Sequence, residues 1–295
     1  MSCCSVARFI CSALAGLTFA GALVAAEPTR LTFDGRLKMD PVFVNQGQDI
    51  VFTVLETPTQ TVLNRLHLED GREERLHPKA TTAEFEAAFS TDDRYCAYVQ
   101  SRGNLTLRLV IHDTREGKES ALEPGGGFSG MRHPSISLAS RRVAFSIPGA
   151  GGQQIVSVDL QAEDRKPLTE GDGLNFWPSF SPDGRSIAFG SSREGDFDIY
   201  VMNADGSELR RLAASPGRDM RPSWSPDGRR LAFTSVRDGN PEIYVVNADG
   251  TGLVRVTNHP EQDDYSAWRP DGRQLVIVSE RSGKFDLYLT DVPSS

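Results

Sequence analysis

Cysteine is scarce in this chain and is placed where it cannot cross-link a fold. The 295 residues include four cysteines, and three of them, Cys3, Cys4 and Cys11, lie close to the first residue. Beyond them only Cys96 is left, in the apolar run "RYCAYV", and a single cysteine cannot form an internal disulfide. The folded domain must therefore be held together by packing and hydrogen bonds, with Cys96 as a small core residue.

Excess positive charge and the common catalytic motifs are also lacking. The formal net charge is −8, and an acidic chain has no general attraction for nucleic acid or anionic lipid. The sequence contains no glycine-rich phosphate loop, no His-Glu-x-x-His and no Cys-x-x-Cys. It therefore assigns no catalytic residue, no cofactor and no dedicated zinc site, and it excludes nucleic acid as the expected partner.

Long hydrophobic runs are confined to the start of the chain. One basic residue, Arg8, is followed by an apolar run from Phe9 and by small residues up to Ala26. This order is typical of a secretory signal peptide cleaved after Ala26, and an uncleaved membrane anchor is the alternative. We expect a mature chain, residues 27–295, that is periplasmic or secreted and does not insert into a membrane.

Against these absences stands an internal repeat. "SPDGRSIAF" begins at Ser181, "SPDGRRLAF" at Ser225 and "RPDGRQLVI" at Arg269, each 44 residues after the previous one. Pro, Asp and Gly in this order suit a tight turn, and the apolar run that follows suits a buried strand. Each copy therefore predicts a hairpin.

The repeat extends backwards through most of the chain. Phe145, Tyr98 and Phe52 stand where Phe189 stands, in degenerate copies spaced by 44 to 47 residues. A second recurring element, "DFDIYVMNADGSELRRL" from Asp196, predicts a third strand, a turn and a fourth strand. Four short strands per unit at this period are typical of propeller blades. The sequence thus predicts an all-β fold, a six-bladed β-propeller of four-stranded blades.

The ends of the repeat array are expected to meet. The last copy has no fourth strand of its own, and "TRLT" from Thr29 matches "VRVT" from Val254. We expect the N-terminal stretch to complete the last blade and close the ring, which hides sheet edges. After a signal peptide of residues 1–26, the single domain of residues 27–295 is expected to contain blades at approximately 41–78, 85–122, 133–169, 177–213, 221–257, and 265–292 plus 28–33.

These motifs, above all "WPSFSPDGRSIAFGSSREGDFDIYVMNADGSELRRLA" from Trp177, resemble the repeats of the TolB-type six-bladed β-propeller, a WD-like family of bacterial periplasmic proteins. The resemblance is strongest from Trp177 to Val292 and concerns the propeller part only, since TolB carries a further α/β domain. The propeller of the family binds an outer-membrane peptidoglycan-associated lipoprotein. The resemblance therefore implies a propeller face that docks a protein, with an envelope lipoprotein among the candidate partners.

Residues that recur at one place in several repeats are expected to hold the blades together. The turn acids Asp183, Asp227 and Asp271 belong to this class as turn formers. Three arginines stand five residues before an acid, and we expect structural ion pairs within the hairpins rather than an anion-binding cluster. The expected pairs are Arg193 with Asp198, Arg237 with Glu242 and Arg281 with Asp286.

One position of the repeat holds a different residue in each copy, and every one of these residues is charged or aromatic. It lies just before the expected innermost strand of each blade, on the side where the longer blade-to-blade connections gather. Its occupants are Asp40, Glu86, His133, Trp177, Arg221 and Tyr265. Trp, Tyr and Arg are enriched in interface hot spots, so we expect these six residues to bind a partner at the channel mouth. The alternative is that the aromatic side chains plug the channel and the charges form a solvated rim.

The sequence favours an exported, monomeric, non-enzymatic propeller that docks a protein or peptide, for example in a cell-envelope assembly. Two alternatives stay open. Asp40, Glu86 and His133 on consecutive blades could hold a divalent metal, which would support lyase or lactonase chemistry on a sugar acid or lactone. The chain could also be a purely structural module, whose association would be insensitive to changes at the channel mouth.

Overall fold

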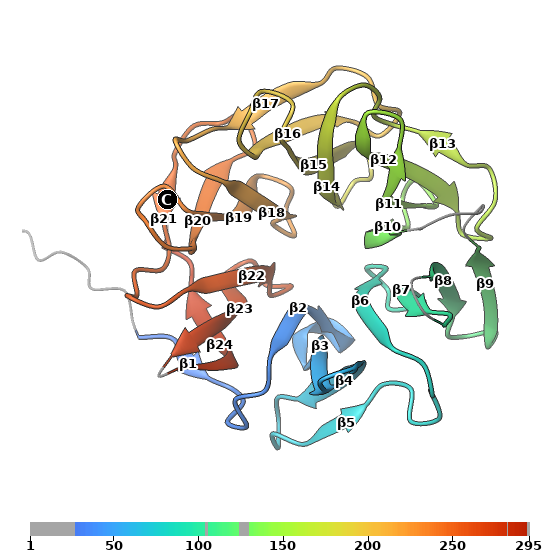
Figure 1. Ribbon diagram of the computed structural model, residues 1–295. Coiled ribbons are helices and arrows are strands. Elements are labelled where there is room, and N and C mark those ends of the chain that lie inside the picture. Colours follow the sequence, from blue (N-terminus) through green and yellow to red (C-terminus); the bar gives the residue numbers. More distant parts are fainter. Residues whose placement is uncertain (1–26, 104–105, 124–129, 282, 294–295) are drawn as a thin grey trace, which may run out of the picture.

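The chain folds as an all-β propeller. The computed structural model describes residues 27–103, 106–123, 130–281 and 283–293. In these ranges it contains strands and one short 3-10 helix, and no helix there is long and apolar enough to cross a membrane. The sheets stand around a central opening (Figure 1), and the first strand of each set lies nearest to it. The expected signal peptide, residues 1–26, lies outside the described residues.

Along the chain, the strands and the short helix are β1 (Thr29–Arg30), β2 (Lys38–Val44), η1 (Asn45–Gly47), β3 (Asp49–Thr57), β4 (Gln60–His67), β5 (Glu73–Arg75), β6 (Glu84–Phe89), β7 (Tyr95–Ser101), β8 (Leu107–Asp113), β9 (Lys118–Leu122), β10 (Arg132–Ser137), β11 (Arg142–Gly149), β12 (Gly152–Asp159), β13 (Lys166–Pro167), β14 (Gly173–Phe180), β15 (Ser186–Ser191), β16 (Asp198–Asn203), β17 (Arg210–Ala213), β18 (Asp219–Trp224), β19 (Arg230–Ser235), β20 (Glu242–Asn247), β21 (Val254–Arg255), β22 (Asp263–Trp268), β23 (Gln274–Arg281) and β24 (Lys284–Asp291).

Four of the sheets have four strands each. Their orders are β2-β3-β4-β5, β6-β7-β8-β9, β18-β19-β20-β21 and β22-β23-β24-β1. The expected third and fourth blades, β10–β13 and β14–β17, instead share one eight-stranded sheet, because β12 pairs in parallel with β14 at Gly152–Gly173 and Gln153–Leu174. A Cβ atom at Gly152 would lie 2.3 Å from the carbonyl oxygen of Gly173, so this junction depends on glycine.

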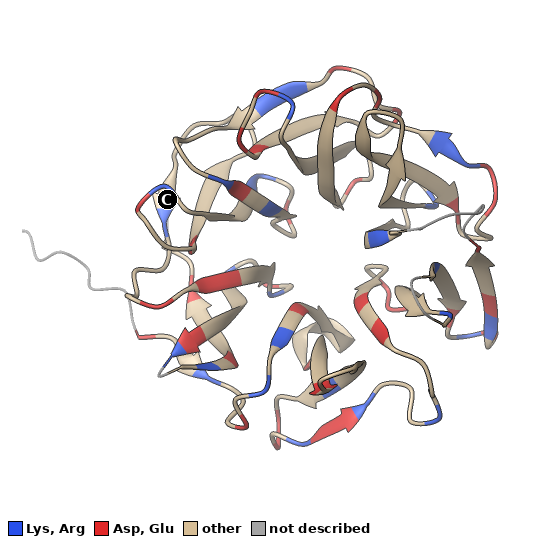
Figure 2. Ribbon diagram, viewed as in Figure 1, with Lys and Arg blue, Asp and Glu red and all other residues tan. Residues whose placement is uncertain are grey.

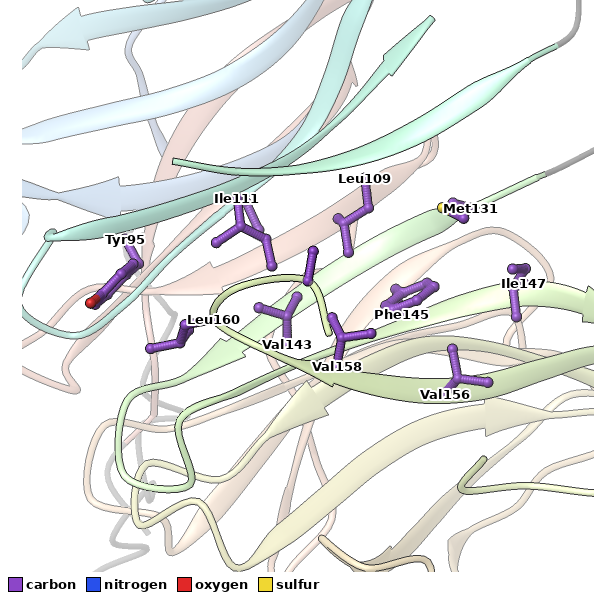
Figure 3. Packing of buried hydrophobic residues seen from close by; sticks show 12 residues of the cluster. Tyr95, Leu109, Ile111, Met131, Val143, Phe145, Ile147, Val156, Val158 and Leu160 are labelled. Atoms are coloured by element: carbon purple, nitrogen blue, oxygen red, sulfur yellow. The ribbon is translucent and has the colours of Figure 1, made fainter. Parts of the chain in front are cut away.

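The hydrophobic core lies in layers between neighbouring sheets. The second and third strands of each set are buried on both faces, which is why they read as continuous apolar runs such as "SIAFGS". Figure 3 shows one layer, in which Leu109 and Ile111 of β8 pack against Val143 and Phe145 of β11. Burying one such side chain stabilises the fold by roughly 1.5–3 kcal/mol, so the layers supply the main attraction between sheets.

The N-terminal strand closes the ring as the sequence predicts. β1 pairs antiparallel with β24, with Thr29 opposite Leu289. The hydroxyl of Thr32 accepts a hydrogen bond of 3.0 Å from the backbone N–H of Leu287. Thr257 makes the equivalent bond to Ile243 in the preceding sheet. The matching of "TRLT" with "VRVT" is therefore confirmed at the level of individual bonds.

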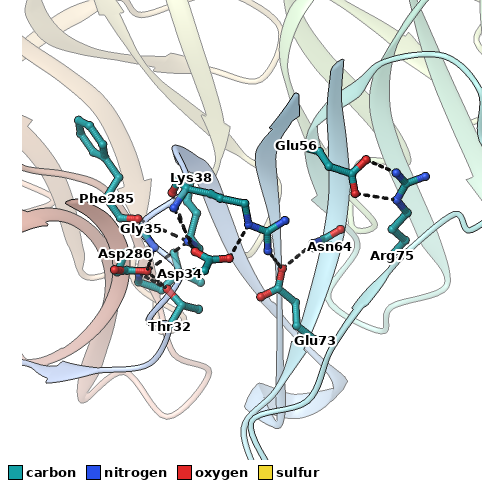
Figure 4. Close-up of polar contacts among 12 residues, drawn as sticks. Thr32, Asp34, Gly35, Lys38, Glu56, Asn64, Glu73, Arg75, Phe285 and Asp286 are labelled. Carbon is teal, nitrogen blue, oxygen red and sulfur yellow. Dashed lines mark hydrogen bonds and ion pairs between the residues drawn. The ribbon is translucent and has the colours of Figure 1, made fainter. Parts of the chain in front are cut away.

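A buried ionic group lies at the same closure (Figure 4). Lys38 and Asp286 are both fully buried, and the Lys38 ammonium lies 3.2 Å from the Asp286 carboxylate and also contacts that of Asp34. Asp286 further accepts hydrogen bonds from the Thr32 hydroxyl at 2.7 Å and from the Arg30 guanidinium at 2.5 Å. The group thus joins the N-terminal segment, β2 and β24 through one carboxylate.

The recurrent acids form turns as predicted. In the turn after β14, the Asp183 carboxylate accepts bonds of 2.6 Å from the Ser181 hydroxyl and 3.1 Å from the Arg185 N–H, and Gly184 has a φ of 68°. The turn after β18 repeats these contacts through Asp227. Neither acid faces the channel, so they are part of the scaffold.

The expected arginine pairs are wrong in their partners. Arg237 lies 3.1 Å from Asp219 on β18 and bonds the Ser235 hydroxyl, while Glu242 pairs with Arg255 of the outer strand. The guanidinium of Arg237 also lies over the Tyr244 ring at 4.7 Å. Each arginine reaches inward to the first strand instead of along its hairpin, because the aromatic ring on the third strand supports it in that direction. The role is structural, as expected.

Candidate functional site: the channel cavity

The innermost strands enclose a cavity of about 590 Å³ in the centre of the propeller. All six residues of the predicted ring line it. They are Asp40, Glu86, His133, Trp177, Arg221 and Tyr265, which come from β2, β6, β10, β14, β18 and β22. Figure 2 shows acidic or basic residues on these strands around the central opening, except on β14. Cavities of this size are typical of ligand sites.

The cavity faces the opposite side from the one the sequence predicted. From the ring, its lining continues to the turns after the innermost strands, for example to Thr91, Pro182 and Pro226. Within the described ranges, its lining contains no residue that precedes the ring residue in any repeat. The ring residues also lie inside the innermost strands and not just before them. They form the inner end of a cavity that extends toward the tight turns.

A β-bulge places each ring residue. The six residues have φ values between 49° and 56°, in the left-handed region that non-glycine residues seldom adopt. The pairing with the second strand shifts at each of them, for example between Phe176 and Ser179 around Trp177. Pro178 follows Trp177, and a residue without an N–H suits a place where the ladder is interrupted. Such conformations cost on the order of 1–3 kcal/mol each and cluster at functional sites.

Glu86 is neutralised by its neighbours in the next repeat. Its carboxylate accepts a bond of 2.6 Å from the Nε of Arg132 and another of 2.6 Å from the backbone N–H of His133. Burial disfavours the charge of Glu86, but His133 and Arg132 outweigh it and lower the pKa of the carboxyl. Burial lowers the pKa of His133 to about 4, so the imidazole is neutral at neutral pH. Its Nδ1 is buried without a hydrogen-bond partner among the described residues.

Arg221 is held by a second set of contacts. Its guanidinium lies 3.1 Å from the Asp264 carboxylate and is stacked 4.2 Å from the centre of the Tyr265 ring. It also lies over Trp177 at 5.1 Å. Burial opposes its charge, but Asp264 raises the pKa of Arg221, while burial raises the pKa of Tyr265 to about 12. Arg221 is thus a fixed cation whose aromatic and acidic partners are already in place.

Trp177 belongs to an aromatic cluster beside the ring. Its ring centre lies 5.3 Å from Phe176, 5.4 Å from Phe197 and 5.5 Å from His133. Phe176 precedes Trp177 on β14, and Phe197 lies in the turn before β16, so the cluster extends away from the cavity. Phe176 and Phe197 therefore support Trp177 from behind.

Asp40 differs from the other charged ring residues. Its carboxylate makes no hydrogen bond or ion pair with any residue in the described ranges, and it faces the cavity. Burial and the nearby charge of Glu86 raise the pKa of Asp40 to about 7, against the opposing effect of Arg221 and Arg132. Asp40 is therefore poised between its protonated and ionised forms near neutral pH.

The structure does not bring the alternative metal ligands together. In the part of the chain that the structure describes, no group of three or more His, Cys, Asp or Glu residues could hold a metal ion. Glu86 is engaged by the Arg132 guanidinium and by the backbone N–H of His133. A site built on Asp40, Glu86 and His133 would need these contacts to break.

The family of the chain follows from its repeats. A family model described as the TolB beta propeller domain matches residues 127–295. The chain belongs to this family. No curated protein matches it significantly.

Solved structures show how far the likeness to TolB proteins and other propellers extends. The putative TolB from Agrobacterium tumefaciens has a TM-score of 0.68 and 21% identity, over 90% of this chain and 93% of that one. TolB from Acinetobacter baumannii has a TM-score of 0.67 and 19% identity, over 85% of this chain and 66% of that one. Oligogalacturonate lyase from Vibrio parahaemolyticus has a TM-score of 0.61 and 15% identity, over 90% and 93%. At these identities the likeness shows the fold alone.

Sequence reasoning noted Asp264 beside the ring without giving it a role and missed Arg132, and these two residues set the charge of this TolB-family channel. Arg132 and Asp264 each precede a ring residue and neutralise a ring residue of opposite sign. Their position in the repeat was a usable signal, because a charged side chain one residue before a ring residue can reach the ring residue of a neighbouring repeat. Phe197 had no such signal, because it reaches Trp177 only through the fold of the turn before β16.

Proposed function

We propose that this chain is a six-bladed propeller that binds a protein or peptide in its channel cavity and catalyses no reaction. In this proposal each set of four strands acts as one blade, including the two sets that share a sheet. The protein acts as a monomer, outside the cytoplasm, after cleavage near Ala26. An envelope lipoprotein is a candidate partner, because the family includes TolB proteins.

One observation carries the proposal. Six residues of different chemistry occupy the same left-handed position of six innermost strands, and all of them line one cavity. A scaffold position would be expected to hold the same residue type in several repeats, as the turn acids and the arginines do in the last three. Strained positions with variable side chains around a cavity are typical of a binding site.

The test compares partner capture by two variants. A chain of residues 27–295 that carries Trp177→Asn and Tyr265→Asn removes two aromatic ring residues, and asparagine tolerates the left-handed backbone at both positions. The control is Phe33→Asn, which removes an aromatic side chain that is 71% exposed and lies outside the cavity. Circular dichroism and thermal unfolding establish that both variants fold.

We expect an envelope protein of the same host to be retained by the wild-type chain and by the Phe33→Asn variant, and to be lost with the ring variant. Equal retention by all three chains would place the binding surface elsewhere or indicate a structural module. The metal-dependent alternative predicts instead a stoichiometric divalent ion in the purified protein, lost on Asp40→Asn.

A further inference from the structure

The charges around the ring do not balance. Glu86 faces Arg132, and Arg221 faces Asp264, which leaves the Asp40 carboxylate without a cation. His133 adds no charge at neutral pH, since the pKa of its imidazole is lowered to about 4. The ring group therefore carries one uncompensated negative charge whenever Asp40 is ionised.

The wall of the cavity beyond the ring has the same sign. Asp93 lines it near the turn after β6, and its carboxylate accepts a hydrogen bond of 2.7 Å from the backbone N–H of Asn45. Apolar side chains, among them Phe180, Trp224 and Trp268, line the cavity between Asp93 and the ring. An occupant that enters from the tight turns would pass Asp93, then the apolar wall, and reach the Asp40 carboxylate at the inner end.

A long cationic side chain has this shape and chemistry. The stems of lysine and arginine pack on apolar surface while the charged end reaches a polar group. An anionic group is disfavoured, because Arg132 and Arg221 are already paired and the remaining charge is negative. The face of the Tyr265 ring cannot bind the partner's cation, because the Arg221 guanidinium already covers it.

We propose, on the basis of the proposed function, that the cavity takes one lysine or arginine side chain of a protein partner, and that Asp40 is the residue that pairs with its charge. The partner segment would enter from the side of the tight turns and pass the apolar wall. The raised pKa of Asp40, due to burial and Glu86, agrees with this, because a bound cation would relieve the cost of ionising the carboxyl.

The test uses pools of short, capped peptides that are random except for one central residue, fixed as Lys, Arg, Gln or Glu. Binding is measured at pH 8, where Asp40 is expected to be ionised. The wild-type chain should retain the Lys and Arg pools about tenfold better than the Gln pool, in line with the coupling of a partly desolvated charge pair. The Glu pool should be retained least.

Two variants make the test specific. Asp40→Asn keeps the shape of the side chain and suits its φ of 49°, and we expect it to abolish the preference for Lys and Arg while retaining the Gln pool. Asp93→Asn is the matched control, because it removes a carboxylate of the same cavity from a residue with a φ of 56°. It should keep most of the preference.

The possible failures separate the two proposals. If no peptide pool binds, the channel does not dock peptides and both proposals fail. If peptides bind without a preference for cations, or if Asp93→Asn removes the preference while Asp40→Asn retains it, the pairing with Asp40 is wrong and peptide docking stands. Preferential retention of the Glu pool would show that Arg221, and not Asp40, pairs with the ligand.

Discussion

At the scale of single residues, the six ring positions share one backbone conformation but hold side chains of different chemical type. Its members share one left-handed φ, yet they range from Asp40 to Trp177. Glycine would adopt this conformation at less cost, so each side chain is retained in spite of the strain it brings. The chemical state of each residue then depends on partners from other sheets.

The titration of Asp40 gives a first prediction. The pKa of its carboxyl is about 7 in the folded chain and near 3.8 when unfolded, so the folded state binds the extra proton and wild-type stability falls as pH rises through this window. Asp40→Asn removes this loss. The stability of the variant minus that of the wild type should therefore be larger at pH 8 than at pH 4, by roughly 3–4 kcal/mol.

Urea unfolding of both chains across this pH range measures the effect. The groups that face Asp40 are Glu86, Arg132, Arg221 and Asp264, and all four stay in place in the variant. Asp196→Asn, which removes an exposed carboxylate, controls for the change in net charge. A stability difference between Asp40→Asn and wild type that is independent of pH would contradict the assignment.

A second prediction concerns the room behind Trp177. A Cβ atom at Gly190 would lie 2.9 Å from Cε3 of the Trp177 ring, too close for an ordinary contact. Gly190→Ala should therefore move the indole and destabilise the fold by about 1–3 kcal/mol, the usual cost of overpacking. Tryptophan fluorescence and chemical unfolding measure both effects. In a Trp177→Leu background the same substitution should be nearly neutral, and an unchanged cost there would show that the indole is not the cause.

The ring itself could be predicted from the sequence, because internal repetition separates a variable position from scaffold positions. The state of its members could not. Glu86 is neutralised and Asp40 is not because of contacts between different sheets. These contacts depend on the directions of the side chains, which the repeat pattern does not predict. The side of the channel was mispredicted for a local reason. The bulge places each ring residue inside the innermost strand and not before it.

At the scale of strands and sheets, the closure concentrates several bonds on one carboxylate. Asp286 joins Arg30, Thr32 and Lys38, and it stands where Glu242 joins Arg255 and Thr257 in the preceding sheet. Lys38 is particular to this closure. It is the first residue of β2, whereas the first residues of β18 and β22 are Asp219 and Asp263. The repeat pattern predicted the pairing of β1 with β24, but not the buried lysine, which departs from the pattern.

Removing one partner of this buried group should be costly. Asp286→Asn leaves the fully buried Lys38 ammonium with Asp34 as its one carboxylate partner among the described residues, and we expect a loss of about 3–5 kcal/mol in the free energy of unfolding. The double variant Lys38→Met with Asp286→Asn should recover part of that loss, because it removes the uncompensated charge. Denaturant unfolding of the two single variants and the double variant measures the coupling. Additive losses would show that the ion pair is not the cause.

At the scale of the whole molecule, the chain is a closed ring of sheets with one irregular junction. The period of the repeat predicted the propeller and the matching of its two ends, since both depend on local pattern. The parallel contact between β12 and β14 could not be foreseen, because it depends on how closely two turns approach at Gly152 and Gly173. Through this contact, backbone hydrogen bonds run without a break from β10 to β17.

Loss of the closing strand should open the ring. A chain that begins at Asp34 lacks β1 and the Thr32 hydroxyl, so the edge of β24 becomes free to pair with other chains. We expect a lower unfolding temperature than for the chain of residues 27–295, together with concentration-dependent association. Thermal unfolding and size-exclusion chromatography measure the two effects. An unchanged monomer with the same unfolding temperature would show that closure by β1 is dispensable.

The shared backbone of the ring also bears on how such a site is inherited. Each repeat of about 44 residues contributes one ring residue together with the bulge that aims it. Duplication of a repeat, or exchange of one repeat for another, therefore transfers one ring residue together with its bulge in a single genetic step. Ligand preference can change in this way without a new strand pairing, because every repeat brings its own hairpins.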